Sequence, residues 1–261
     1  MKRTRHLMPD TWTEDVPLLR KKFPQADIVV HSSRHRQQAH GHQMAEVYLM
    51  ANPAAELHLC HMQDNHLALR VELGRCPASW SFGHDFSDPE TRSEFEQRIH
   101  NRMIEEFKRQ DPSVFDGGLI FASAGNWDQS RRGRPHMDPN LASPQDIWRR
   151  NHLNLFLIAA CDPDNGRPAL FSGDCAEYPP DVAYPGERIP VTDPVSAGRV
   201  LIDGTSPAAA FAAGHIARLG ITDAQGVIDY WVRFSRVAQG WERGRLHRKN
   251  GRGAFLLGDV V

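Results

Sequence analysis

The chain has 261 residues, with 31 basic and 32 acidic side chains and a formal net charge of -1. This length suits one domain with a sizeable core and is too short for two comfortable ones, so we expect a single domain over residues 1–261. A nearly neutral chain has no overall field that would draw it to nucleic acid or to a membrane surface, so we expect neither as a partner.

The four cysteines are widely spaced and form no C-x-x-C pair, which indicates reduced core thiols rather than a zinc ribbon or a redox motif. The charged N-terminus is not followed by the apolar region of a secretory signal. Nowhere do about 18 apolar residues run together, as a membrane-spanning helix requires. We therefore expect a cytoplasmic protein.

The first elements are a short helix, a strand and a second helix. The N-terminal 25 residues are polar and charged, with a helix expected over residues 14–22. The sequence ADIVVHSS at 26–33 is short, apolar and β-branched, which predicts a buried strand. After a polar loop, residues 40–51 predict a helix that begins beside a histidine.

A histidine at a helix start suits proton transfer. The neutral imidazole of His40 could take the proton of a serine hydroxyl and later return it to a leaving amine. His35 and His42 lie close in sequence, so a metal-binding pair is the alternative. Because no clear set of cysteines or carboxylates completes a metal site, we favour the general base and expect no metal.

Four further segments follow this helix. Residues 53–62 alternate as a strand, and residues 78–83 predict a strand that ends in a glycine turn. Residues 87–109 carry apolar side chains at helical spacing in a charged stretch, which predicts an amphipathic surface helix. Residues 117–126 predict a buried strand that narrows to small residues and ends on an amide.

The next buried strand is expected at 153–160. Asp162, Asp164 and Asn165 then resemble a fragment of a calcium loop, but no glutamate follows at the proper spacing. A turn is the better interpretation, so we expect no cofactor, and structural calcium has only weak support. Residues 199–202 predict a short strand.

Residues 203–214 (DGTSPAAAFAAG) join a polar turn to a small-residue apolar run, which predicts the buried start of a helix with Ser206 in its first turn. Free backbone N–H groups and the positive end of the helix dipole would stabilise negative charge near Ser206. Ser206 is therefore a candidate nucleophile, with a simple helix cap as the alternative. A further amphipathic helix is expected at 222–239 and an edge strand at 254–261.

Four of these segments resemble, in order, the motifs of the subtilisin-like serine peptidases. Residues 40–46 (HGHQMAE) resemble H-G-T-H-V-A-G, and residues 81–83 (SFG) resemble Ser-Leu-Gly. Residues 122–126 (ASAGN) resemble A-A-G-N, and residues 204–214 (GTSPAAAFAAG) resemble G-T-S-M-A-A-P-H-V-A-G. The resemblance covers roughly residues 26–240.

Alternating strands and helices predict an α/β fold with a mostly parallel sheet. The resemblance implies the subtilisin-like form of it, with three layers and helices flanking a central sheet. It also implies serine endopeptidase activity. In this reading Ser206 is the nucleophile, His40 the general base, and the Asn126 amide a donor in the oxyanion hole.

The resemblance further implies that an extended peptide pairs with the chain as an added strand. The residues implied for this contact are Ser81, Phe82, Gly83, Ala124 and Gly125. The expected partner is accordingly a protein or peptide substrate, and a regulatory protein could restrain the activity.

The family pattern also needs an aspartate that orients the histidine, and laying 26–33 on that pattern places His31 there. Asp27 lies four residues upstream, displaced by about 13 Å along a strand. Three explanations are open. The acid comes from the N-terminal segment, as Asp10 or Asp15; His40 works alone or with His31; or the chain is a pseudo-peptidase that binds a peptide without cutting it.

We expect an active serine peptidase. The alternatives are a peptide-binding or scaffold protein that uses the edge at 81–83 and, with weaker support, a metal-dependent hydrolase that uses the histidines at positions 31, 35, 40 and 42.

Overall fold

The computed structural model describes residues 4–10, 16–31, 39–61, 66–81, 117–126, 154–167, 169, 171–172, 180–234, 236–237 and 255–256. Seven of its strands form one central sheet: β1 (Arg5–Asp10), β2 (Asp27–Val30), β3 (Glu56–His61), β4 (Ala78–Trp80), β5 (Ile120–Ser123), β6 (Leu155–Cys161) and β7 (Val182–Pro185). Their order across the sheet is β2-β3-β1-β4-β5-β6-β7, and every pairing between them is parallel.

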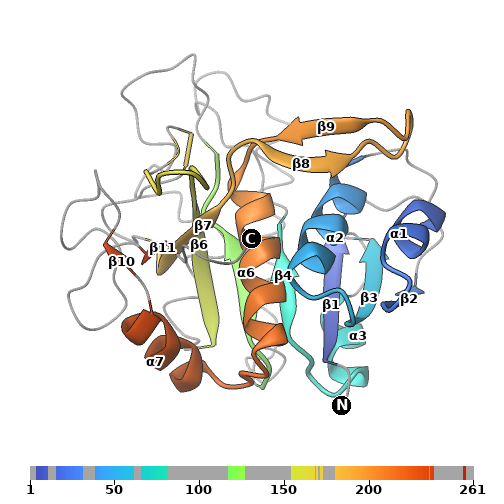
Figure 1. Ribbon diagram of the computed structural model, residues 1–261. Helices are drawn as coiled ribbons and strands as arrows, with labels where there is room; N and C mark the ends of the chain where they lie inside the picture. The colour runs from blue at the N-terminus through green and yellow to red at the C-terminus, as the bar shows by residue number, and fades with distance from the viewer. Residues whose placement is uncertain are drawn as a thin grey trace, which may run out of the picture.

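The remaining elements surround this sheet. The helices are α1 (Pro17–Lys22), α2 (Ala39–Ala51), α3 (His66–Glu72), α6 (Thr205–Arg218) and α7 (Ala224–Phe234). Strands β8 (Ile189–Thr192) and β9 (Arg199–Ile202) form an antiparallel hairpin, and β10 (Arg236–Val237) pairs with β11 (Phe255–Leu256). Figure 1 shows α2 and α6 side by side across one face of the sheet, with the β8–β9 hairpin beyond their upper ends.

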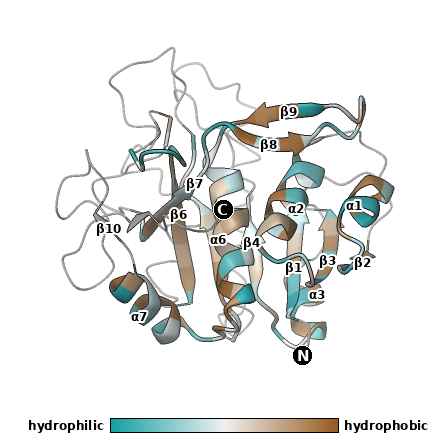
Figure 2. Ribbon diagram, in the orientation of Figure 1, coloured by the Kyte–Doolittle hydropathy of each residue, from teal (hydrophilic) through white to brown (hydrophobic). Residues whose placement is uncertain are grey.

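Both faces of the sheet are buried. Met8 of β1 belongs to the main core, which also holds residues of α2 and α6, whereas its neighbour Leu7 packs on the opposite face with Leu69 of α3 and Leu73, which follows α3. Successive strand residues point to opposite faces, so a sheet covered on both sides needs strands that are apolar throughout. All seven residues of β6 are buried, and this strand is mostly brown in Figure 2. The predicted α/β layered fold is confirmed.

The sequence did not reveal β1. Five of its six residues are buried although it contains Arg5, His6 and Asp10, so the expectation that the N-terminal 25 residues hold only polar structure and a helix was wrong. The strand is central, because it pairs with β3 on one side and β4 on the other. Its polar residues are accommodated by specific contacts, which hydrophobic periodicity cannot reveal.

The strand predicted at 26–33 is β2, and it is shorter and less buried than expected. It lies at the edge of the sheet, where Asp27 is exposed and Val29 and Val30 are half-buried. The strand predicted at 199–202 is β9, whose partner is β8 rather than a strand of the central sheet. The amphipathic helix predicted at 87–109 lies outside the described residues.

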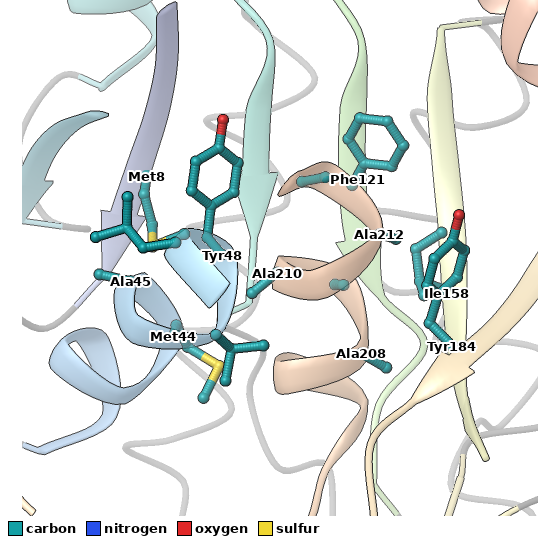
Figure 3. Close-up of a cluster of buried hydrophobic side chains, with 14 of the residues drawn as sticks. Met8, Met44, Ala45, Tyr48, Phe121, Ile158, Tyr184, Ala208, Ala210 and Ala212 are labelled. Atoms are coloured by element: carbon teal, nitrogen blue, oxygen red, sulfur yellow. The ribbon is translucent and has the colours of Figure 1, made fainter. Parts of the chain in front are cut away.

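Helices α2 and α6 pack against each other at a glycine. A Cβ atom added to Gly214 of α6 would lie 2.5 Å from the carbonyl oxygen of Tyr48 and 2.9 Å from Cβ of Ala51, both in α2. Alanines continue this small surface along α6. In Figure 3, Ala210 faces α2, while Ala208 and Ala212 face the side of Ile158 and Tyr184. Small side chains therefore set how closely the two helices approach.

Replacing Gly214 by Ala is expected to destabilise the protein by about 1–3 kcal/mol, because the added methyl group meets backbone atoms that cannot rotate away. Urea unfolding measures the loss. Gly226→Ala in α7 is the matched control. Its new methyl group would meet the Cγ2 atom of Ile221 at 3.0 Å, a side-chain atom that can move, and alanine favours a helix by about 1 kcal/mol over glycine. Equal stability of the two variants would contradict the close packing.

Two buried histidines are held neutral by the fold. His6 of β1 stacks on Tyr48 with ring centroids 4.3 Å apart, and in the described structure neither of its ring nitrogens has a hydrogen-bond partner. Burial, with a contribution from His58, lowers the pKa of His6 to about 3. Burial and then Arg218 lower the pKa of His215 to about 4.

His215 also needs a lone pair on Nδ1. The Tyr184 hydroxyl lies 3.1 Å from this nitrogen, and its oxygen accepts a hydrogen bond of 3.0 Å from Trp231 Nε1. The hydroxyl proton is thereby directed to His215. Protonation of Nδ1 would break this link between β7, α6 and α7.

The free energy of unfolding is therefore expected to fall as the pH drops below about 6.5. At this pH both histidines are protonated in the unfolded state but stay neutral in the folded state. Each of them therefore lowers the free energy of unfolding by about 2 kcal/mol at pH 5. His40, whose pKa is raised, acts in the opposite sense. Urea unfolding at pH 8 and pH 5 measures the slope, and His6→Phe should reduce it. An unchanged slope in that variant would exclude His6 as a cause.

Candidate active site

A buried carboxylate holds a histidine at the start of α2. Asp10 is the last residue of β1 and is 1% exposed, and His40 is the second residue of α2. His40 Nδ1 lies 2.8 Å from Oδ1 and 3.0 Å from Oδ2 of Asp10. The carboxylate accepts a hydrogen bond from Nδ1, so neutral His40 carries its lone pair on Nε2.

Two opposing effects set the protonation of His40. Burial is the larger single influence and disfavours the imidazolium, but the hydrogen bond and the charge of Asp10 together outweigh it, so the pKa of His40 is raised. The side chain of His40 is 41% exposed, so another molecule can reach it. This arrangement suits a group that takes and returns a proton.

Ser206 lies in the first turn of α6 and is 9% exposed. Its hydroxyl donates a hydrogen bond of 2.7 Å to the carbonyl oxygen of Ser81, and the Ser81 hydroxyl donates one of 3.2 Å to the carbonyl oxygen of Ser206. These reciprocal bonds join the end of β4 to the start of α6. Among the described residues, no hydrogen bond connects Ser206 directly to His40.

Asn126 is oriented by the residue before the serine. Its Oδ1 accepts hydrogen bonds from the Thr205 backbone N–H at 2.8 Å and from the Thr205 hydroxyl at 3.0 Å. The same hydroxyl oxygen accepts the Gly125 N–H at 3.0 Å. These bonds assign the amide oxygen to Thr205 and so fix the orientation of the Asn126 amide. No sequence motif indicated that Thr205 fixes this amide.

Gly125 turns the chain between β5 and Asn126. Its φ of +92° lies in a region that side chains rarely adopt, so glycine suits the position. Its neighbour Ala124 is buried and donates its N–H to the carbonyl of Ile158 in β6. The backbone before Asn126 is therefore fixed by the sheet.

The other candidate partners of His40 lie elsewhere. His31 Nε2 is 2.8 Å from His58 Nδ1, and His58 Nε2 is 2.9 Å from Oε1 of Glu56. Asp27 begins β2, two strands from β1 and at the opposite end of the sheet from the strand ends that carry Asp10. Asp10 is thus the described candidate that contacts His40. Asp15, Phe82 and Gly83 lie outside the described residues.

The calcium-like fragment at 162–165 forms a turn closed by an arginine. Asp162 accepts the Asp164 N–H and the Asn165 amide, both at 2.8 Å, and Arg188 pairs with Asp164 at 2.6 Å and with Asp162 at 3.2 Å. In the part of the chain that the structure describes, no three His, Cys, Asp or Glu side chains gather so that they could hold a metal ion. None of the described helices is long and apolar enough to cross a membrane.

Asp10, His40, Asn126 and Ser206 all follow the carboxyl ends of parallel strands or begin a helix against them. A serine at a helix start, a histidine bonded to a buried carboxylate and an oriented amide are the groups of an α/β serine hydrolase.

The sequence comparison identifies the family. A sequence model of the subtilase family matches residues 78–225, more than half of the chain, so this chain belongs to the subtilase family of serine peptidases. The resemblance stated from the motifs is confirmed. The match includes Asn126 and Ser206, whereas Asp10 and His40 precede it. No curated protein has a significantly similar sequence.

Solved structures share the fold over nearly the whole chain. The prenylagaramide maturation protease PagA has a TM-score of 0.59 and 15% identity, over 98% of this chain and 91% of that chain. The A-subunit of the AB5 toxin from E. coli has a TM-score of 0.56 and 15% identity, over 97% of this chain and 89% of that chain. The MycP3 protease of the type VII (ESX-3) secretion system has a TM-score of 0.58 and 14% identity, over 91% of this chain and 78% of that chain. Similarity at this identity shows a common fold, and the predicted subtilisin-like fold is confirmed.

Replacing Asp10 by Asn is expected to lower the pKa of His40, because the neutral amide no longer favours the imidazolium while burial still opposes it. NMR titration of the histidine ring protons measures this. Asp27→Asn removes a carboxylate from β2 and should leave the titration of His40 unchanged. An unchanged His40 titration in Asp10→Asn would contradict the contact.

Proposed function

We propose that the protein is a serine endopeptidase that cleaves peptide bonds through an acyl-enzyme on Ser206. The observation that supports this most is the hydrogen bond from His40 to the buried Asp10 carboxylate. In this proposal Asp10 is the orienting acid, one of the candidates that the sequence left open. It also leaves Nε2 of His40 as the free base, on a helix that packs directly against the helix of Ser206.

In the proposed reaction the Ser206 hydroxyl first leaves the Ser81 carbonyl and turns to His40 Nε2. His40 takes the proton while Ser206 Oγ attacks the scissile carbonyl carbon. His40 then gives the proton to the leaving amine, and the acyl-enzyme forms. Water deprotonated by His40 hydrolyses it and restores Ser206. Asp10 keeps the proton of His40 on Nδ1 throughout.

The negative oxygen of the intermediate needs donors that are already in place. The proposed donors are Nδ2 of Asn126 and the backbone N–H of Ser206, aided by the positive end of the α6 dipole. Thr205 supports this role because its two hydrogen bonds to Oδ1 fix which way the amide points. Such a donor contributes about 3 kcal/mol to transition-state stabilisation in comparable sites.

The substrate is proposed to be a protein or peptide that extends along Ser81, Phe82 and Gly83, as an added strand. The Ser81 carbonyl then serves two partners in turn. It accepts the Ser206 hydroxyl in this structure, and it would accept a main-chain N–H of the peptide. The proposed chemistry uses no metal or cofactor, and we further propose a cytoplasmic location and restraint by a regulatory protein.

One observation favours a second candidate function. The Ser206 hydroxyl is bound to the Ser81 carbonyl and, within the described residues, not to His40. A chain in which this bond persists would bind a peptide at the same edge without cutting it, as a peptide-binding or scaffold protein.

Labelling with a fluorophosphonate probe separates the two functions. The wild type should be labelled covalently, Ser206→Ala should not be labelled, and His40→Ala and Asp10→Asn should react more slowly, the latter by about 10⁴-fold. Asp27→Asn is the control and should react like the wild type. Full labelling of Ser206→Ala would exclude this nucleophile, and an unlabelled but folded wild type would favour peptide binding.

A further inference from the structure

A carboxylate with no exposure lies on the helix that carries His40. Glu46 of α2 is 0% exposed, and its Oε1 accepts a hydrogen bond of 2.6 Å from Lys22 Nζ of α1. The backbone N–H of Thr192, at the end of β8, lies 3.1 and 3.0 Å from its two oxygens, and the Thr192 hydroxyl donates at 3.3 Å. One side chain thus joins α1, α2 and β8.

The chemistry of this contact is unusual for its position. The family motif H-G-T-H-V-A-G ends on glycine where this chain has Glu46, so the contact belongs to this sequence and not to the motif. A buried carboxylate costs several kcal/mol unless it is paired and hydrogen-bonded, and the contacts with Lys22 and Thr192 offset that cost for Glu46. Glu46 therefore holds its three elements in one relative position.

The positive charge opposite Glu46 comes from Lys22. His42 lies one turn earlier on the same face of α2, is 3% exposed, and has no partner on either ring nitrogen in the described structure. Burial, and then Lys22, lower the pKa of His42 against the opposing charges of Glu46 and Asp193. His42 accordingly stays neutral, and the ion pair depends on Lys22.

Strand β8 leads from Glu46 to the serine. Thr192 pairs with Arg199 at one end of the hairpin, and Ile189 pairs with Ile202 at the other end, four residues before Ser206. Two hydrogen bonds brace that second end: Gly204 N–H to the Gly186 carbonyl at 2.8 Å, and Arg188 N–H to Asp203 Oδ1 at 2.7 Å. The hairpin is therefore a braced connection between Glu46 and the start of α6.

We infer that Glu46 is a positioning residue that sets His40 relative to Ser206 by tying α2 to the hairpin that leads into α6. It touches no reacting atom. The inference rests on the proposed function for its kinetic consequence. A shift of about 1 Å between reacting groups can cost about 100-fold in rate, so a loosened tie should lower the rate of chemistry more than substrate binding.

The experiment compares Glu46→Ala, Glu46→Gln and Lys22→Met with the control Glu56→Ala. Glu56 is also a paired carboxylate, with Arg5 and His58, but it does not contact α2 or β8 through these bonds. We expect kcat of Glu46→Ala to fall between about 10- and 100-fold with KM within about 2-fold. Glu46→Gln keeps an acceptor for Thr192 and should recover part of kcat.

A second readout does not need activity. Hydrogen exchange at the Gly204 and Thr205 amides, which bond to Gly186 and Asn126, should quicken in Glu46→Ala and not in Glu56→Ala. If the wild type shows no labelling, the proposed function fails, and this exchange still decides the inference. A folded Glu46→Ala variant with unchanged exchange, or with a kcat equal to that of Glu56→Ala, would overturn it.

Discussion

The close approach of α2 and α6 is the constraint on which the site depends. His40 lies at the start of one of these helices and Ser206 at the start of the other, so the distance between the proposed base and the proposed nucleophile follows from how the two helices pack. Gly214 lets the backbone of α2 come within contact of α6, and alanines keep the rest of this surface small. Closely packed protein interiors have little room to adjust, so a change in the packing of these helices would move the proposed reacting groups relative to each other.

Polar side chains also fix the relative positions of the elements that form the site. Asp10 fixes the ring of His40, Thr205 fixes the amide of Asn126, and Glu46 connects α2 with the hairpin before Ser206. Each contact joins two elements that are distant in sequence and buries at least one polar group. Such groups stabilise a structure only when all their partners are present, so they favour one arrangement over similar alternatives.

The α/β fold class, the family and the candidate nucleophile, base and amide could be predicted from short motifs and apolar runs. The orienting acid could only be narrowed to several candidates, because β1 breaks the apolar pattern with His6 and Asp10. Its burial depends on Tyr48 and His40, which follow more than 25 residues later. The contacts of Glu46 could not be predicted for the same reason, because Thr192 lies 146 residues away in the sequence.

The pairing of β1 with β4 divides the chemistry between two parts of the chain. The two strands share one register pair, Leu7 with Ala78, and the boundary between them separates β2-β3-β1 from β4-β5-β6-β7. The proposed acid and base lie in residues 4–61, and the proposed nucleophile and amide donor lie beyond residue 78. Neither part holds a complete set of reacting groups. A complete site would therefore require both parts of the sheet, so a nascent chain would carry no complete site until most of it had been synthesised.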